Sequence, residues 1–178
     1  MNVYGDMDGV SALFEKASIE EITSKGFFAS RKPVPNVIEF FRMLSQNPTI
    51  NFYSLSAVLS DMAEEEKRGW NKEHAPFIKP DHQIYLPYGV DKAAYLKAQG
   101  IMVNDNDILI DDFSPNLYGW HGIGVKMYNG INGTHGTWHG YSIHSDMTPE
   151  IMYRQMVGIC MSVKLQEQYI NTTQQNCL

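Results

Sequence analysis

Acidic residues stand at two places in this chain where their spacing would let paired carboxylates do chemistry. Asp6 and Asp8 lie two residues apart, directly after a short apolar segment, and Asp111 and Asp112 directly follow a second one. Hard cations such as Mg²⁺ prefer oxygen ligands, usually one or two carboxylates together with phosphate oxygens and water. Asp6, Asp112 and the backbone carbonyl of Asp8 are therefore candidate ligands of a magnesium ion.

Such a site could transfer a phosphoryl group. A bound cation would neutralise phosphate charge, so that the carboxylate of Asp6 could attack phosphorus in line and form an aspartyl-phosphate. Asp8 could protonate the leaving oxygen and later activate water. Gly9 would allow the tight turn that brings backbone amides towards the phosphate.

Each motif on its own also has a purely structural explanation. A D-x-D-G segment is common in turns and in calcium loops, and a pair of aspartates often only ends a strand. What favours function is the combination, because each acidic motif follows a predicted strand.

The elements that must position these residues alternate between strand and helix. This order predicts an α/β fold, a three-layer sandwich with a parallel sheet of about five strands covered on both faces. All carboxyl ends of a parallel sheet lie along one edge, where ligands bind. Asp6, Ser56 and the Asp111–Asp112 pair would therefore meet in one pocket. The predicted strands span Asn2–Gly5, Thr49–Leu55, Gln83–Leu86, Asp107–Ile110 and Gly124–Met127.

The remaining segments predict one domain over residues 1–170, followed by a polar tail at 171–178. Residues 129–146, rich in Gly, Asn and His, are expected to form a long loop or a small hairpin. Residues 149–169 have the apolar spacing of an amphipathic helix. Its apolar side could pack on the sheet or against a second copy, and we favour the sheet, so the sequence implies no oligomer.

Composition narrows the class of partner and the location. A formal net charge of −6 argues against binding to a nucleic-acid polymer but not against a small anionic substrate. Cys160 and Cys177 form no disulfide framework, which favours a reducing, cytoplasmic location. No apolar run reaches the roughly 20 residues of a membrane span, and the first residues show no signal-peptide pattern.

Three segments of the chain resemble motifs of the haloacid dehalogenase (HAD) superfamily. Residues 3–10 (VYGDMDGV) resemble its first motif, residues 51–56 (NFYSLS) its second, and residues 107–112 (DILIDD) its fourth. Within the superfamily they look most like the 5′(3′)-deoxyribonucleotidases and their bacterial and phage relatives, which share the N-G-x-N-G-x-x-G-x-W pattern at 129–138. The resemblance covers about residues 1–138.

The resemblance implies a magnesium-dependent phosphatase with a Rossmann-like fold. Asp6 would be the nucleophile and Asp8 the general acid and base, with Asp112 as a metal ligand and Asp111 supporting the metal directly or through water. Ser56 would bind the phosphate through its hydroxyl group.

The family's phosphate-binding lysine has two candidates here. Lys67 stands in the sequence EKRGW, which resembles the E-K-x-x-W of the deoxyribonucleotidases. Lys92 begins a predicted helix before the fourth motif, where the superfamily usually has its lysine. A cation in the first turn of a helix opposes the helix dipole, so an anionic pocket would explain Lys92 there. We favour Lys92 and keep Lys67.

The substrate is less defined than the reaction. The deoxyribonucleotidases carry a helical cap after the first motif, whereas here only about residues 11–32 are available, so a minimal cap is expected. Phe28 and Arg31 in this insert are candidates for contacts with a base or sugar. The favoured substrate is a nucleoside monophosphate. The alternatives are another small phosphate ester, or a catalytically silent module that only binds phosphate.

Overall fold

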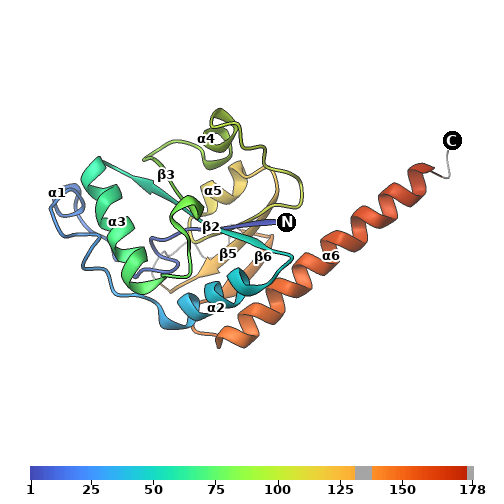
Figure 1. Ribbon diagram of the computed structural model, residues 1–178, viewed down its shortest axis with the longest axis horizontal. Coiled ribbons are helices and arrows are strands. Elements are labelled where there is room, and N and C mark those ends of the chain that lie inside the picture. The colour runs from blue at the N-terminus through green and yellow to red at the C-terminus, as the bar shows by residue number, and fades with distance from the viewer. Residues whose placement is uncertain (131–137, 176–178) are drawn as a thin grey trace.

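The computed structural model describes residues 1–130 and 138–175, which form a six-stranded sheet flanked by helices (Figure 1). All strand pairs are parallel, in the order β3-β2-β1-β4-β5-β6. This arrangement confirms the predicted α/β, Rossmann-like fold. The strands are β1 (Asn2–Gly5), β2 (Asn51–Val58), β3 (Gln83–Pro87), β4 (Ile108–Asp111), β5 (Ile123–Tyr128) and β6 (Tyr141–His144).

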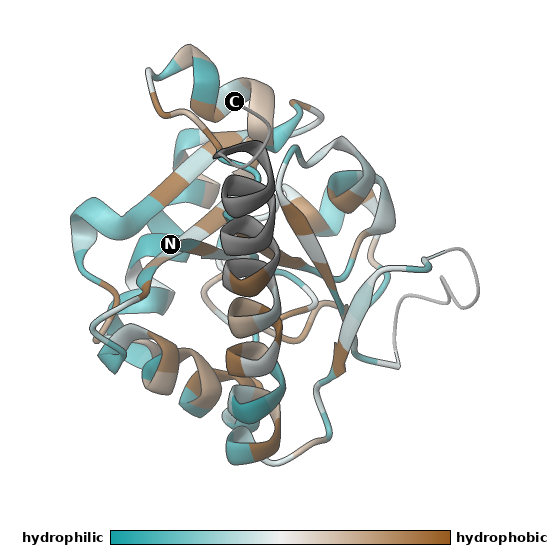
Figure 2. Ribbon diagram, turned by 90° about the vertical axis from the view of Figure 1, so that its right-hand side faces the viewer, coloured by the Kyte–Doolittle hydropathy of each residue, from teal (hydrophilic) through white to brown (hydrophobic). Residues whose placement is uncertain are grey.

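Helices cover both faces of the sheet. The long helix α6 crosses one face, and Figure 2 shows hydrophobic residues recurring along its described part. Helix α2 packs beside α6 on that face, while α4 and α5 lie on the other. The helices are α1 (Ile19–Ile22), α2 (Pro35–Gln46), α3 (Asp61–His74), α4 (Lys92–Ala98), α5 (Ser114–Gly119) and α6 (Pro149–Gln175), with a 3₁₀ turn, η1 (Pro80–His82).

Alternation along the central strands creates these two layers. Val3 and Ile108 point into the core beneath α2 and α6, whereas their neighbours Tyr4 and Leu109 point into the core beneath α4 and α5. All four side chains are at most 1% exposed. Because both faces of a parallel sheet are covered, its inner strands are apolar throughout and only their ends are free to carry polar groups.

The strand order has one point of reversal, between β1 and β4. From β1 the chain first adds β2 and β3 on one side and then returns to add β4, β5 and β6 on the other. The connections after β1 and β4 therefore diverge, and a crevice is left at the carboxyl ends of these two strands. Both acidic motifs of the chain are at this crevice.

The number of strands and the structure within residues 129–146 differ from the prediction. Instead of a hairpin, Tyr141–His144 form β6, which pairs parallel with β5 and gives the sheet a sixth strand. Only Ile143 of β6 is buried, so this edge strand carries a weak hydrophobic signal. Residues 131–137 of the N-G-x-N-G-x-x-G-x-W pattern lie outside the described residues.

Two element boundaries also differ. Ser56 does not follow the second strand but lies inside β2, which continues to Val58 because β3 pairs with it along that length. Helix α6 continues to Gln175, past the predicted end at 169 and into the predicted tail. None of the helices in the described part of the chain has both the length and the apolar character of a membrane span.

Candidate active site

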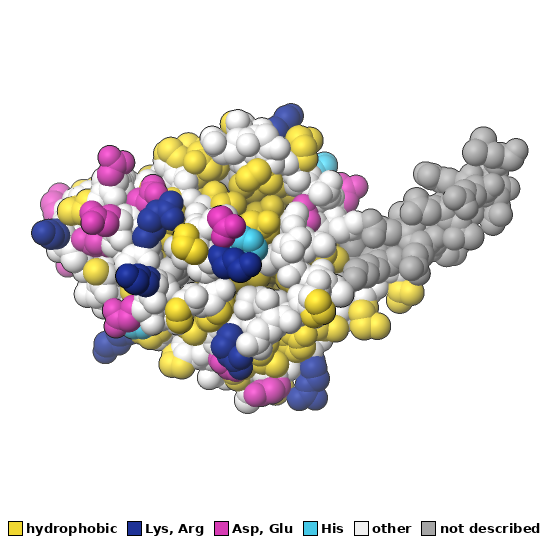
Figure 3. All heavy atoms as spheres, viewed as in Figure 1, with side chains coloured by type: hydrophobic (Ala, Val, Ile, Leu, Met, Phe, Trp, Pro, Cys, Tyr) yellow, Lys and Arg dark blue, Asp and Glu magenta, His cyan; other side chains and the backbone are white. Residues whose placement is uncertain are grey.

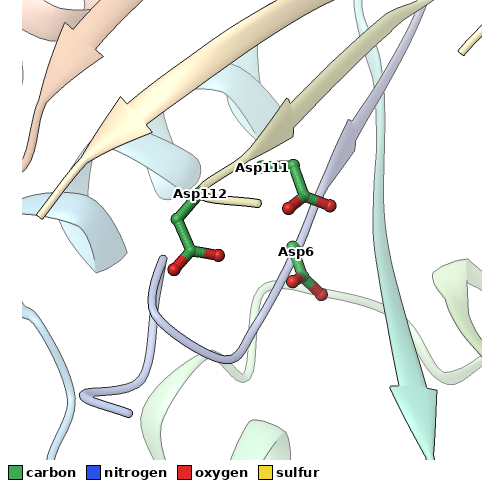
Figure 4. A group of neighbouring side chains, drawn as sticks. All are labelled: Asp6, Asp111 and Asp112. Carbon is green, nitrogen blue, oxygen red and sulfur yellow. The ribbon is translucent and has the colours of Figure 1, made fainter. Parts of the chain in front are cut away.

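Three carboxylates meet at the crevice between β1 and β4 (Figure 4). Asp6 follows β1, and its backbone N–H donates to the carbonyl of Ile110 (2.9 Å), which extends the ladder between the two strands. Asp111 is the last residue of β4, and Asp112 follows it. One carboxylate oxygen from each of Asp6, Asp111 and Asp112 lies within 4.8 Å of the other two, and all three residues are buried.

A tight loop after Asp6 brings the rest of the first motif against Asp112. Gly9 has a φ of +73°, and a Cβ atom there would collide with the carboxylate of Asp112 and approach the Asn129 amide nitrogen to 3.1 Å. Only glycine therefore allows both this backbone conformation and this close approach. The glycine that the sequence assigned to a turn thus also makes room for a carboxylate from another strand.

Lys92 connects the two acidic motifs from the first turn of α4. Its ammonium group lies 2.6 Å from Oδ2 of Asp111 and 3.2 Å from Oδ1 of Asp6, and its side chain is 3% exposed. Burial acts to lower the pKa of Lys92, but the carboxylates of Asp111 and Asp6 raise it above its ordinary value. Lys92 is therefore a fixed positive charge beside Asp6.

Lys67 occupies a different position, behind Asp8. Its ammonium group donates to Oδ2 of Asp8 (2.5 Å), to the hydroxyl of Ser56 (2.9 Å) and to the carbonyl of Ala57 (2.6 Å). These contacts account for all three of its N–H donors. The ring of Phe28 lies over it, with its centroid 4.5 Å from Nζ. Lys67 thus holds Asp8 in place.

Two polar residues from the β5 side, which the sequence did not single out, brace Asp112. Asn129 donates from Nδ2 to the carbonyl of Gly9 (2.6 Å) and to Oδ2 of Asp112 (3.0 Å). Lys126 is 1% exposed, and its ammonium group contacts the backbone carbonyl of Asp112 and the hydroxyl of Ser114. The sequence did contain a signal for Lys126, since it is a lysine inside an otherwise apolar strand. A charged side chain in such a position needs a buried polar partner.

Three hydrogen-bond donors hold the carboxylate of Asp111. Its Oδ1 accepts from the backbone N–H of Phe113 (2.8 Å), and its Oδ2 accepts from Asn116 (2.9 Å) as well as from Lys92. With both oxygens engaged, Asp111 is better placed to orient its neighbours than to react.

Burial and mutual repulsion raise the pKa of acidic side chains at the site. Burial, followed by the negative charges of Asp6 and Asp111, raises the pKa of Asp112 to about 8. Burial also raises the pKa of Asp8 above its usual range, although Lys67 acts in the opposite direction. Without a cation, the site therefore does not accommodate all of its negative charges at neutral pH.

A pocket of about 570 Å³ opens over the carboxylates. Asp6, Asp8, Lys92, Asp112 and Asn116 form its polar part. Apolar side chains from the insert and from the loops after β2, β3 and β4 form most of its wall. These are Phe14, Ile19, Ile22, Phe28, Leu59, Tyr88 and Phe113.

The pocket separates the predicted site residues into two groups. Lys92 and Phe28 line it together with Asp6, Asp8 and Asp112. Asp111, Lys67 and Ser56 lie behind its surface and are fully buried. Arg31 lies on the outer side of the insert, where Nε donates to the carbonyl of Phe27 (3.0 Å). Of the two lysines, only Lys92 is placed to meet a phosphate in the pocket.

Comparison with known families agrees with this arrangement. The family model described as "5' nucleotidase, deoxy (Pyrimidine), cytosolic type C protein" matches residues 16–142, which are 127 of the 178 residues. The matched span contains Lys67, Lys92 and the Asp111–Asp112 pair, and begins after Asp6 and Asp8. A comparison with curated proteins gives no match. On this match and this fold, the chain belongs to the 5′ nucleotidase, deoxy (pyrimidine), cytosolic type C family, a HAD-like family of phosphatases that act on phosphomonoesters.

Proposed function

We propose that this enzyme releases phosphate from nucleoside monophosphates, that it requires Mg²⁺, and that it works through an aspartyl-phosphate on Asp6. The observation that carries the proposal is that Asp6, Asp112 and Lys92 line one pocket, with the buried carboxylate of Asp111 converging on them and paired with the Lys92 ammonium group. A nucleophilic carboxylate, a fixed cation for the phosphate and oxygen ligands for a metal are what phosphoryl transfer requires.

The residues present suit a magnesium ion. Oxygen atoms of three carboxylates converge, and Oδ1 of Asp6 accepts no hydrogen bond within the described residues, although Lys92 lies at ion-pair distance. Asp6 and Asp112 would bind the ion together with the carbonyl of Asp8, and Asp111 would support it directly or through water. When bound, Mg²⁺ would neutralise charge on the phosphoryl group.

The first chemical step forms the bond between Asp6 and phosphorus. A carboxylate oxygen of Asp6 attacks the phosphorus atom while Lys92 binds a phosphate oxygen. The bond from phosphorus to the ester oxygen breaks, and that oxygen takes the proton of Asp8. The raised pKa of Asp8 favours the protonated state that this transfer needs.

The second step reverses the role of Asp8. Its carboxylate, held by Lys67, takes a proton from a water molecule, and the water oxygen attacks phosphorus. The bond between phosphorus and Asp6 breaks, which releases inorganic phosphate and regenerates both aspartates. Lys67 therefore acts through Asp8, by positioning it for both proton transfers, and not by binding the phosphate itself.

The shape of the pocket supports a substrate with a flat organic group. The exposed Tyr88 and Phe113, on the wall formed by the strand-end loops, can offer ring faces to a nucleobase, and the buried Phe28 forms part of the insert side of the wall. The matching family is named for deoxy pyrimidine nucleotides, and we propose the same class here. We also propose a cytoplasmic location, on the cysteine usage of the sequence.

A phosphate-release panel with Mg²⁺ tests this function. It compares pyrimidine and purine nucleoside monophosphates, in deoxy and ribo forms, with sugar phosphates and a generic aryl phosphate. A pyrimidine deoxynucleoside monophosphate is expected to have the highest kcat/KM, by about tenfold or more over sugar phosphates, because its base contacts the apolar wall and a sugar phosphate has no such ring. A sugar phosphate as the best substrate would support a non-nucleotide phosphatase instead.

Mg²⁺ is expected to stabilise the fold, and to do so more at high pH. The pKa of Asp112 is about 8 in the folded protein and about 4 in the unfolded chain. Between about pH 4 and about pH 8, the carboxyl group of Asp112 is therefore protonated in the folded protein but ionised in the unfolded chain. The metal-free protein accordingly loses stability as the pH rises from about 4 to about 8. The cation replaces that proton. Melting temperatures with Mg²⁺ and with EDTA should differ more at about pH 8.5 than at about pH 5.5, and equal values at every pH would count against the metal site.

A further inference from the structure

The insert is attached to helix α3 by one short turn, residues 26–31, which we call the insert turn. Figure 1 shows the insert, with α1, beside α3 at one end of the molecule. Gly26 begins the turn with a φ of +88°, a conformation that glycine adopts without strain. Three of the turn's backbone N–H groups donate to carbonyls in or next to the turn, but those of Gly26, Phe28 and Ala29 do not. These three N–H groups therefore need an acceptor from elsewhere.

Glu66 on α3 supplies that acceptor. Its Oε1 accepts from the N–H of Gly26 (2.5 Å), and its Oε2 accepts from the N–H of Phe28 (3.0 Å) and of Ala29 (3.4 Å). One carboxylate thus satisfies three backbone donors that lie about 40 residues away in sequence. Bonds from N–H groups to a charged acceptor are among the stronger hydrogen bonds in proteins.

Trp70, one helical turn further along α3, holds the other end of the turn. Its indole N–H donates to the carbonyl of Arg31 (2.6 Å), and its ring is buried. Between these two contacts, the ring of Phe28 rests over Lys67, the residue that holds Asp8. Glu66, Lys67 and Trp70 therefore join the insert to the catalytic loop through one face of α3.

The insert turn places the insert side of the pocket wall. Phe28 is 4% exposed, packs edge-on against Phe27 and contacts Ala63 of α3 within one apolar cluster. Phe14 and Ile22 pack against the same cluster and, like Phe28, line the pocket. The position of this wall thus depends on how firmly the turn is attached to α3.

We propose that Glu66 is a positioning residue that selects for substrates with a large organic group, by fixing the insert turn and with it the Phe28 wall. The proposal rests on the proposed function, since the wall faces the phosphate site. Glu66 does not touch the reacting atoms. Its effect is on how strongly the organic part of the substrate is bound.

The test is Glu66→Gln, assayed with three phosphorylated substrates. Gln has one acceptor oxygen and places an NH₂ group against backbone donors, so part of the attachment is lost. KM is expected to rise about tenfold for a nucleoside monophosphate and for p-nitrophenyl phosphate, with little change in kcat. Acetyl phosphate, which has no ring to meet Phe28, should be unaffected.

The three substrates separate this role from others. A loss of kcat confined to the nucleotide would place the effect on proton transfer by Asp8, because the other two leaving groups need little protonation. An equal loss for all three would indicate general structural damage. Either result, or no change at all, would overturn the proposal. Glu65→Gln, at an exposed position on the same helix, is the matched control.

Limited trypsin digestion gives a readout that does not need turnover. Lysine and arginine side chains lie at the surface around α1 and α3 (Figure 3). Exposed Lys25 directly precedes the insert turn and Arg31 ends it, so trypsin can cut at both ends of the turn. Cleavage there should be faster in Glu66→Gln than in the wild type or in Glu65→Gln. If the wild type hydrolyses no ester, the proposed function fails, yet digestion still tests the attachment.

A second variant covers the case in which Glu66→Gln does not fold. Trp70→Phe keeps a ring in the core but removes the N–H bond to Arg31. It should show the same pattern with a smaller rise in KM and faster cleavage at Lys25 and Arg31. Wild-type values of KM and of cleavage rate in this variant would contradict the role of the insert turn.

Discussion

Asp6→Asn is expected to remove phosphate release almost completely, by at least about 10⁴-fold in kcat. The amide is nearly the same size as the carboxylate, so the fold should remain, but its oxygen is a poor nucleophile for phosphorus. It also removes one negative charge from the set that converges with Asp111 and Asp112. Initial rates with a nucleoside monophosphate and Mg²⁺ measure the loss.

The control for this variant is Asp105→Asn. Asp105 is an exposed aspartate that pairs with surface His121. Its loss should leave the rate unchanged. A wild-type enzyme quenched during turnover should carry one phosphoryl group on the peptide that contains Asp6, detectable by mass spectrometry. Turnover that survives in Asp6→Asn, or a phosphoryl group on another residue, would refute the mechanism.

Asp8→Asn is expected to separate the two chemical steps. With a nucleoside monophosphate, whose leaving group needs a proton, kcat should fall by about 10³-fold. With p-nitrophenyl phosphate the first step should remain fast, because its leaving group departs without protonation. The second step still needs a base to activate water, so one equivalent of nitrophenol should appear in a burst before a slow steady rate.

This burst identifies the role of Asp8, because a variant with only a distorted pocket would lose both phases together. The Asn side chain keeps an oxygen that can accept from Lys67, so the contact that positions residue 8 is retained. The burst amplitude is measured by stopped-flow absorbance at several enzyme concentrations. Equal losses for both esters without a burst would contradict the assignment.

The meeting of the acids at one edge of the sheet could be predicted from the sequence, because strand ends in a parallel sheet converge whatever the details of packing. Their roles in the reaction stay predictions. Asp6, Asp8, Asp111 and Asp112 each follow an apolar strand that is easy to recognise. Lys92 could be favoured from its place in the first turn of a helix, where a cation is unfavourable unless anions lie nearby. The structure places it between two carboxylates.

The supporting residues could not be predicted in the same way. Asn129 and Lys126 contact Asp112 only because β5 pairs with β4. No local sequence pattern indicates that these two side chains would be the partners of Asp112. The four residues of β6 carry too little hydrophobic alternation to be read as a strand, and form one because the edge of β5 offers unpaired backbone groups.

The sequence by itself determined the acids of the site, their order along the chain and the parallel sheet that gathers them, since these follow from local hydrophobic pattern and strand–helix alternation. Only the tertiary structure decided what surrounds Asp6 and Asp8. It placed Lys67 against Asp8 and not in the phosphate pocket, and it attached the insert to Glu66. These contacts join residues about 40 to 60 positions apart, and such pairings depend on how whole elements pack, which a single sequence does not specify.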